Sequence, residues 1–412
     1  MGKVFLKALI MGFLVIPFLL PPLSSAQEKE PIRIGFISTL TGVFAQSGKD
    51  NLDGAKLYLE KIGYQMAGRR VEFLPEDEEA SPSVALTKAK KLVELNKVHF
   101  LTGPLLASSG YAVAPYAESK KVPDVTFCAA DDLTQRKRGK YLFRVTWSSS
   151  QPSHILGEYA YKVLGYRKVA AIALDYAFGW ETVSGFQRAF EELGGTVIQK
   201  IWVPMNVADF APYLPQIRKD ADAVHAMMTG KSSVLFLKQF QEYGLKDKLP
   251  VNGVGHLTDE SILPAMGDAA LGVITALPYS PMIDTPVNKE FVKTYVAKYG
   301  KTPSLFSAMA YTCMGMVDQA VNSLKGDVSN SERNARALRT LHVKDDPRGP
   351  IKFDAYGNST QNVYIRKVEK VGGELQNTVI YTYPEVSQFW KYKPEEFLKQ
   401  PVYSRDYPPL KP

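Results

Sequence analysis

The sequence predicts an α/β protein of two lobes, each built around a doubly wound parallel sheet. Short apolar segments typical of buried strands alternate with longer segments whose apolar residues recur at helical spacing. This alternation runs through the chain twice, first over residues 32–145 and again from Ser150. With 412 residues, 45% of them hydrophobic, the chain is too long for one ordinary core and can bury two.

The first series begins with a strand, a polar loop and a helix. Ile32, Ile34 and Phe36 alternate as in a buried strand, and residues 38–47 form a loop rich in hydroxyls and glycines. Apolar residues at the spacing of a helix face follow within residues 50–62. The series continues with strands at 71–74, 98–102 and 125–128, helices at 81–95 and 107–120, and an extended exit at 141–145.

The second series repeats the pattern and is followed by further helices and strands. We expect helices at 152–164, 180–193, 210–218 and 232–243, and strands at 169–174, 196–203, 223–227 and 250–254. The chain then carries helices at 288–299 and 304–324 and strands at 351–353, 362–368 and 377–381. The aromatic and proline-rich residues 383–412 suggest a strap laid over one lobe.

The first 26 residues have the features of an export signal. Lys3 and Lys7 flank the start of an apolar run, and Ser24 and Ala26 are the small residues that a signal peptidase reads. We expect cleavage after Ala26. A membrane anchor is the alternative, but the apolar run is short and broken by prolines. No cysteine lies near the cleavage site, so we expect no lipid anchor.

The charge of the chain gives no sign of a nucleic-acid partner. The net charge is +8, or +6 without Lys3 and Lys7. The densest basic cluster, residues 136–140, has no interleaved aromatic residues and no nucleic-acid motif, so we interpret it as a solvated loop. Cys128 and Cys313 are expected to be buried free thiols, although a bridge between them stays open.

No catalytic or metal-binding motif is present in the sequence. It contains no G-x-S-x-G, Walker, H-E-x-x-H or C-x-x-C pattern, and its five histidines are scattered without ligand spacing. The acidic run 76–79 could attract a cation, but a solvated loop is the simpler interpretation. Residues 252–255 are glycine-rich and are interpreted as a turn at a strand end. We therefore expect neither an enzyme nor a bound metal or cofactor.

The order of residues over 32–55 resembles the opening of the periplasmic leucine/isoleucine/valine-binding proteins, the type I solute-binding proteins of ABC transporters. The resemblance covers about residues 32–370. It implies two lobes joined by a three-strand hinge, with crossings near 145–147, 276–279 and 349–352. The expected organisation is a signal peptide at 1–26, an N-terminal lobe at 27–146 and 277–349, and a second lobe at 147–276 and 350–412 that includes the strap.

In this family one lobe holds the ligand carboxylate in the loops after its third and fourth strands, through hydroxyls and backbone amides. The corresponding residues here are 105–109 and 126–130. Ser108 and Ser109 are candidates for the carboxylate, and simple helix capping is an equal alternative for either one. The candidates on this side are Phe44, Ser47, Leu106, Ser108, Ser109, Phe127, Cys128 and Ala129.

The other lobe resembles the family at residues 175–179, 229–231 and 254–256. Amino-acid binders place a carboxylate near the last segment to pair the ligand ammonium, but this chain has His256 there and no acid until Asp259. Five aromatic residues surround the predicted cleft and together favour an aromatic or apolar ligand, although for each residue alone a core position is the better interpretation. The candidates on this side are Tyr176, Phe178, Gly230, His256 and Tyr279.

These observations predict a periplasmic solute-binding protein of an ABC transporter. It would capture a small carboxylate, either an aromatic or apolar organic acid or a branched-chain amino acid, and deliver it to a membrane permease by closing two lobes around it. We expect a monomer. A ligand-sensing protein of the same fold that reports to a receptor is the alternative.

Overall fold

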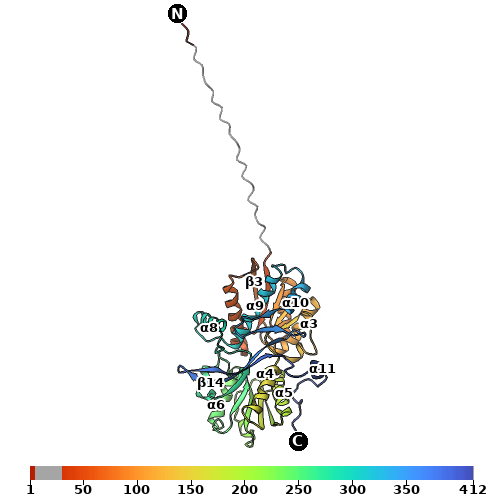
Figure 1. Ribbon diagram of the computed structural model, residues 1–412, viewed down its shortest axis with the longest axis vertical. Coiled ribbons are helices and arrows are strands. Elements are labelled where there is room, and N and C mark those ends of the chain that lie inside the picture. The colour runs from red at the N-terminus through yellow and green to blue at the C-terminus, as the bar shows by residue number, and fades with distance from the viewer. Residues whose placement is uncertain (5–29, 412) are drawn as a thin grey trace. The chain divides into compact units, whose positions relative to one another are not determined.

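The computed structural model describes residues 1–4 and 30–411, and residues 31–411 belong to one compact unit organised around two sheets (Figure 1). The predicted cleavage site after Ala26 lies outside the described residues and stays a prediction. No helix of the described part is long and apolar enough to cross a membrane.

The first sheet has strand order β2-β3-β1-β4-β5-β6. Its strands are β1 (Ile32–Ser38), β2 (Gln65–Met66), β3 (Arg69–Asp77), β4 (Phe100–Thr102), β5 (Asp124–Thr126) and β6 (Leu142–Arg144). All neighbours pair in parallel except β2, which forms an antiparallel hairpin with β3. Ile32, Ile34 and Phe36 are fully buried in β1, as the alternation predicted.

Helices cover both faces of the first sheet. One face packs on α1 (Ala45–Lys61), α9 (Leu305–Ser323) and α10 (Ser331–Arg339). The other packs on α2 (Pro82–Lys90), which continues as a π-helical turn at Lys91–Leu95, and on α3 (Ala107–Lys120). The Ser81 hydroxyl caps α2 by accepting from the Val84 amide, as predicted. α8 (Pro286–Tyr299) packs beside α9.

The second sheet has order β12-β13-β14-β11-β10-β9-β7-β8, and β15 pairs with β14 outside this order. Its strands are β7 (Lys168–Leu174), β8 (Thr196–Val203), β9 (Ala223–Met227), β10 (Val251–Val254), β11 (Ile274–Leu277), β12 (His342–Val343), β13 (Ile351–Phe353), β14 (Ser359–Val371) and β15 (Glu374–Val386). The five strands β7–β11 are parallel, and β12–β15 join them as antiparallel strands.

This sheet is also covered on both faces. One face packs on α6 (Lys231–Glu242) and α7 (Leu263–Met266), and the other on α4 (Ser150–Lys162) and α5 (Ala177–Glu192). The predicted helix at 210–218 is wrong. Within it only a single 3-10 turn forms, at Leu214–Gln216, because Pro212 and Pro215 interrupt the segment.

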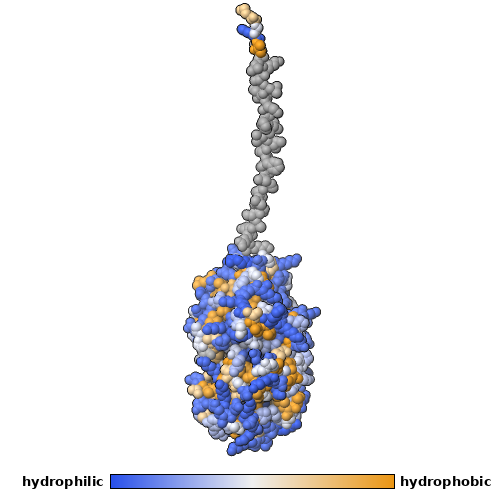
Figure 2. Space-filling model, turned by 90° about the vertical axis from the view of Figure 1, so that its left-hand side faces the viewer, coloured by the Kyte–Doolittle hydropathy of each residue, from blue (hydrophilic) through white to orange (hydrophobic). Residues whose placement is uncertain are grey.

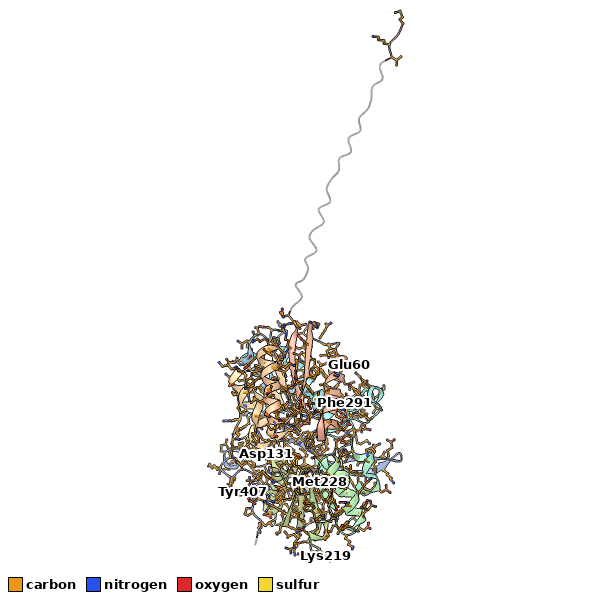
Figure 3. All side chains as sticks on the ribbon, turned by 180° about the vertical axis from the view of Figure 1, so that it is seen from behind. Glu60, Asp131, Lys219, Met228, Phe291 and Tyr407 are labelled. Carbon is orange, nitrogen blue, oxygen red and sulfur yellow. The ribbon has the colours of Figure 1, made fainter. Side chains whose placement is uncertain are left out.

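The predicted fold class is confirmed, with the correction that each sheet is mixed rather than wholly parallel. The chain passes from the first sheet to the second between β6 and α4, leaves it after β11, and returns before β12. We keep the lobe boundaries given above as a proposal. Figure 3 places Asp131 between the two sheets, Glu60 toward the far end of the first and Lys219 at the far end of the second.

The C-terminal residues 387–411, including α11 (Pro394–Phe397), lie over α4 and α5 as the predicted strap. His154 of α4 is buried among four aromatic rings of this segment, and its Nε2 lies 2.9 Å from Tyr403 Oη. Ser184 and Gln187 of α5 donate to the carbonyls of Tyr407 and Pro409. The strap therefore completes the packing of the second sheet.

The surface and the cysteines agree with the sequence analysis. On the face shown in Figure 2, hydrophobic residues are interspersed with hydrophilic ones. Cys128 and Cys313 are both buried and free, as interpreted. In the basic cluster, Arg136 pairs with Asp132, and Lys140 pairs with Glu332, so these charges are used within the chain.

Candidate functional site

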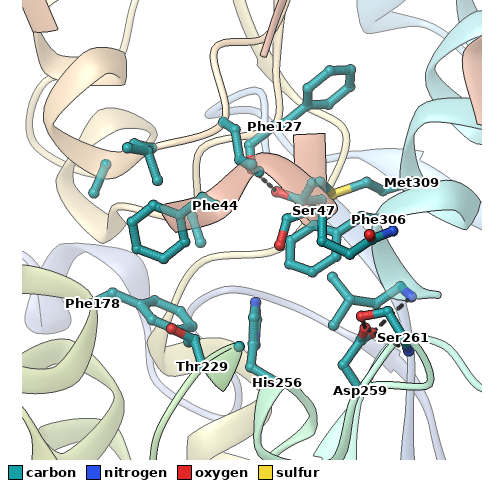
Figure 4. Close-up of a pocket in the computed structure, with 18 of the residues that line it drawn as sticks. Phe44, Ser47, Phe127, Phe178, Thr229, His256, Asp259, Ser261, Phe306 and Met309 are labelled. Carbon is teal, nitrogen blue, oxygen red and sulfur yellow. Dashed lines mark hydrogen bonds between the residues drawn. The ribbon is translucent and has the colours of Figure 1, made fainter. Parts of the chain in front are cut away.

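A cavity of about 420 Å³ lies between the two sheets, at the carboxyl ends of their parallel strands. Loops after β1, β4 and β5 line it from the first sheet, and loops after β7, β9 and β10 line it from the second. The start of α9 completes the wall (Figure 4). The volume suits a small molecule enclosed on most sides.

Several helices begin at this cavity. Its lining includes the first residues of α1, α3, α6 and α9, and for α5 the N-cap residue Tyr176 and the second residue Phe178. The N-cap residues of α3, α5 and α6 make no side-chain cap hydrogen bond, and Glu78 accepts from the Leu105 amide just before α3, whereas the Ser304 hydroxyl caps α9 by accepting from the Ser307 amide. Free backbone N–H groups and the positive ends of the helix dipoles attract an anion. The α3, α5 and α6 side of the cavity is therefore suited to a carboxylate.

Aromatic side chains provide most of the remaining surface. Six of the lining residues are aromatic, namely Phe44, Phe127, Trp147, Tyr176, Phe178 and Phe306. The His256 ring lies among them, with centroid distances of 4.8 Å to Phe178 and 5.9 Å to both Trp147 and Phe306. Burial lowers the pKa of His256 to about 3 and Arg366 adds to the shift, so the imidazole is neutral at pH 7. This wall is apolar and uncharged.

Two charged side chains reach the lining within the described residues. Lys231 stands at the first position of α6 and is exposed. Asp259 is buried and accepts hydrogen bonds from Ser261 and from the Leu305 amide of α9. From the sequence we expected no acid beside His256 to pair a ligand ammonium, and Asp259 in the cavity wall corrects that expectation. The 3-10 turn Gly255–Thr258 folds the chain back and brings the acid into the cavity wall.

The acidic run 76–79 is not a solvated loop as interpreted, because it holds the cavity loops in place. Asp77 accepts from the Leu40 amide at 2.8 Å and from the Thr41 hydroxyl at 2.6 Å. Glu78 is fully buried and accepts from Thr39 and from the Leu105 amide. Burial raises the pKa of Glu78, and these hydrogen bonds oppose that shift.

Most of the predicted ligand-binding residues come together at the cavity. Those that line it are Phe44, Ser47, Leu106, Phe127, Ala129, Tyr176, Phe178, Gly230 and His256. Ser108, Ser109, Cys128 and Tyr279 lie outside the lining. Whether the nine lining residues contact a ligand remains a prediction.

The four predicted residues that do not line the cavity have other places in the fold. α3 begins at Ala107 with Leu106 at its N-cap, so Ser108 is exposed on the helix and Ser109 lies buried beside Glu78. The Cys128 side chain packs against Gly110 and Leu133. Tyr279 is fully buried against Phe291 of α8, with ring centroids 6.4 Å apart. The two serine hydroxyls expected for the carboxylate therefore do not line the cavity.

Several residues that line the cavity were not among those predicted from the sequence. Trp147 lies in the first crossing between the sheets, and Leu305, Phe306 and Met309 belong to the start of α9. The Pro303-Ser304 pair was a usable signal, because a serine N-cap after a proline marks a helix start. Nothing local in the sequence indicates that this helix start faces the loops after β7 and β10.

Comparison with known proteins now adds to this geometry. The family model described as "Periplasmic binding protein" matches residues 31–373. The chain belongs to this family. The family predicted from the sequence is thus confirmed, and so is its type I fold.

Relatives and solved structures agree with this family. Leu/Ile/Val-binding protein homolog 6 of Brucella melitensis is 29% identical over 368 residues, which is 87% of this chain and 93% of that protein. An ABC transporter substrate-binding protein from Sphaerobacter thermophilus has a TM-score of 0.84 at 34% identity, covering 87% of this chain and 99% of that one.

A second solved structure is a solute-binding protein of an ABC transporter from Rhodopseudomonas palustris BisB5. It was crystallised with 3,4-dihydroxybenzoic acid. Its TM-score is 0.82 at 34% identity, and the match covers 87% of this chain and 98% of that one. The chain is thus similar over most of its length to substrate-binding proteins of ABC transporters. Such proteins bind a small molecule and deliver it to a permease.

Proposed function

We propose that this protein captures a small organic acid with an aromatic or other apolar body in the periplasm and delivers it to an ABC transporter permease. The observation that carries the proposal is the composition of the cavity wall. The starts of α3, α5 and α6 offer free amides to a carboxylate, and six aromatic side chains, among them Tyr176 and Phe178 at the start of α5, line the same cavity.

The ligand's charge and its ring would use different parts of the wall. The amides at the starts of α3, α5 and α6, together with Lys231, supply positive potential for the carboxylate. The neutral His256 and the rings of Phe178, Trp147 and Phe306 offer faces and edges to a flat apolar body. The similar Rhodopseudomonas palustris protein, crystallised with an aromatic acid, supports this ligand class.

A branched-chain amino acid is the competing ligand, since Brucella relatives are named Leu/Ile/Val-binding protein homologs. Asp259 is an acid that could receive an ammonium. However, it lies at the start of α9, which Ser304 already caps, and not at the uncapped starts of α3, α5 and α6. An α-amino acid carries its ammonium next to its carboxylate. It cannot readily place the ammonium at Asp259 and the carboxylate at these helix starts at the same time. The aromatic acid therefore fits better.

A thermal-shift panel tests the proposal. A ligand at about 100 times its dissociation constant stabilises a protein by about 2.7 kcal/mol, so candidates can be ranked without knowing the ligand beforehand. We expect aromatic and short apolar acids to raise the melting temperature more than leucine, isoleucine or valine. If leucine gives the largest shift, the proposed ligand class is wrong and the amino acid is the ligand.

A further inference from the structure

Asp259 is the one carboxylate in the cavity lining among the described residues, and it lies on the side of the cavity opposite Phe44 and Phe178 (Figure 4). Only 2% of the residue is exposed. A buried carboxylate in the wall of a binding cavity is costly to desolvate unless it has donors. The acceptor positions of Asp259 that the protein leaves free therefore indicate whether a ligand would offer it a hydrogen-bond donor.

The protein already supplies three donors to Asp259. Its Oδ1 accepts from the Ser261 amide at 3.1 Å and from the Ser261 hydroxyl, and its Oδ2 accepts from the Leu305 amide at 3.2 Å. A carboxylate has about four lone-pair positions. One acceptor position is left, and Asp259 is among the residues that line the cavity.

The charges around Asp259 do not favour a second carboxylate there. Glu260 and Asp50 are its acidic neighbours, and the nearby cations are paired elsewhere, Arg366 with Glu260 and Lys301 with Asp50. Burial, with Glu260 and Asp50 adding to it, raises the pKa of Asp259 to about 7. A ligand carboxylate therefore avoids this side of the cavity and turns toward the uncapped helix starts, which leaves the other end of the ligand facing Asp259.

We propose that Asp259 determines specificity by accepting a hydrogen bond from a hydroxyl group that the ligand carries away from its carboxylate. This proposal rests on the proposed function, because it assumes that an aromatic acid occupies the cavity. It implies that the protein selects phenolic acids over aromatic acids that lack a ring hydroxyl. A site built to hydrogen-bond a substrate hydroxyl rejects the analogue that lacks it, because the buried acceptor is then left unpaired.

A ligand series tests the proposal in the unmodified protein. We would measure dissociation constants by calorimetry for benzoate, 3- and 4-hydroxybenzoate, and 3- and 4-methylbenzoate. The methyl compounds match the hydroxyl in size but donate no hydrogen bond. We expect one hydroxybenzoate to bind about tenfold or more tightly than its methyl counterpart, the ratio expected for one hydrogen bond.

Two variants then assign the preference to a residue. Asp259→Asn keeps the shape of the side chain and removes its charge, and we expect the affinity of the hydroxybenzoate to fall to within about threefold of the affinity of its methyl counterpart. Asp247→Asn replaces an exposed aspartate of the same lobe and should leave the ratio unchanged. Circular dichroism checks the folding of both variants.

The outcomes separate this proposal from the proposed function. If benzoate binds but no hydroxybenzoate binds more tightly than its methyl counterpart, aromatic acids remain the ligands and the role of Asp259 is wrong. The same holds if Asp259→Asn folds and keeps the full ratio. If none of the aromatic acids binds and leucine does, both proposals fail. Because the ligand series needs no variant, a series without any hydroxyl preference overturns the proposal even if Asp259→Asn does not fold.

Discussion

The Asp131 amide donates a hydrogen bond to Glu181 Oε2 over 3.1 Å, which joins the loop after β5 of the first sheet to α5 of the second. The two carboxyl groups are buried together, and the Ser150 amide donates to the Asp131 carboxylate. Burial raises the pKa of Asp131 to about 6, and burial with the charge of Asp131 raises that of Glu181 well above its ordinary value. Both groups thus resist ionisation in the folded protein.

We therefore expect Glu181→Gln to reduce the dependence of stability on pH. Because the folded pKa values lie above the unfolded ones, the pair contributes stability that is complete below about pH 4 and is lost as pH rises through 6 and beyond. Urea unfolding at pH 5 and pH 8 measures this loss, which should be smaller in the variant. Glu242→Gln, at an exposed position of α6, is the control. An unchanged pH dependence would contradict this role of the pair.

Ala107→Pro should weaken ligand binding without destabilising the protein. Proline is favoured at the first position of a helix, and Leu106 before it has φ −80° and ψ 147°, which proline tolerates. The substitution removes one free amide from the α3 start. We expect affinity for aromatic acids to fall about tenfold by calorimetry, the effect of losing one hydrogen bond to a charged group.

Ser331→Pro makes the same change at the first position of α10, away from the cavity, and should leave affinity unchanged. Ser108→Ala should also have little effect, since Ser108 lies outside the lining. Unaltered binding in Ala107→Pro would remove the α3 amide from the carboxylate site.

Phe44→Ala tests the aromatic wall. Phe44 lines the cavity and is only half-buried, so its loss should affect ligand contact more than folding. We expect benzoate to bind about tenfold more weakly by calorimetry, because an aromatic contact of this kind contributes about 1 kcal/mol beyond its buried area. Phe73→Ala, a partly buried position of β3 outside the lining, should lose stability and keep its affinity. Equal losses of affinity in the two variants would point to a global effect.

Tyr403→Phe should destabilise the strap. The variant removes the hydroxyl that lies 2.9 Å from Nε2 of the buried His154, and an unpaired buried polar group costs about 1 to 3 kcal/mol. Thermal and urea unfolding should show this loss at unchanged ligand affinity. Tyr407→Phe is the control, because the Tyr407 hydroxyl makes a 3.3 Å contact to Gln400 at the surface. If Tyr403→Phe is as stable as the control, the contact with His154 does not hold the strap.

Much of the fold could be predicted because the local pattern and the tertiary structure agree. β8 and β9 have the bounds predicted for them, and Ser81 caps α2. The polar helix α10 was missed, since few of its residues are apolar. α1 begins at Ala45, five residues before the expected start, because a 3-10 turn at Gly42–Phe44 leads directly into it.

The site could be predicted where it depends on loops at strand ends. Phe44, Tyr176 and Gly230 follow β1, β7 and β9, and parallel strands place such loops at one edge. Asp259 and Phe306 could not be assigned, because their approach depends on how α9 packs beside the loop after β10, over 40 residues apart in sequence. The hydroxyls of Ser108 and Ser109 were predicted from the family's use of the loop after the third strand, but both residues belong to α3 and lie outside the lining.

Calorimetric titration of the mature protein with benzoate, hydroxybenzoates and leucine decides which class of ligand the cavity holds. We predict one site per chain and at least one aromatic acid that binds about tenfold or more tightly than leucine, since the uncapped starts of α3, α5 and α6 face a wall of aromatic rings. Tighter binding of leucine than of every aromatic acid would contradict this conclusion.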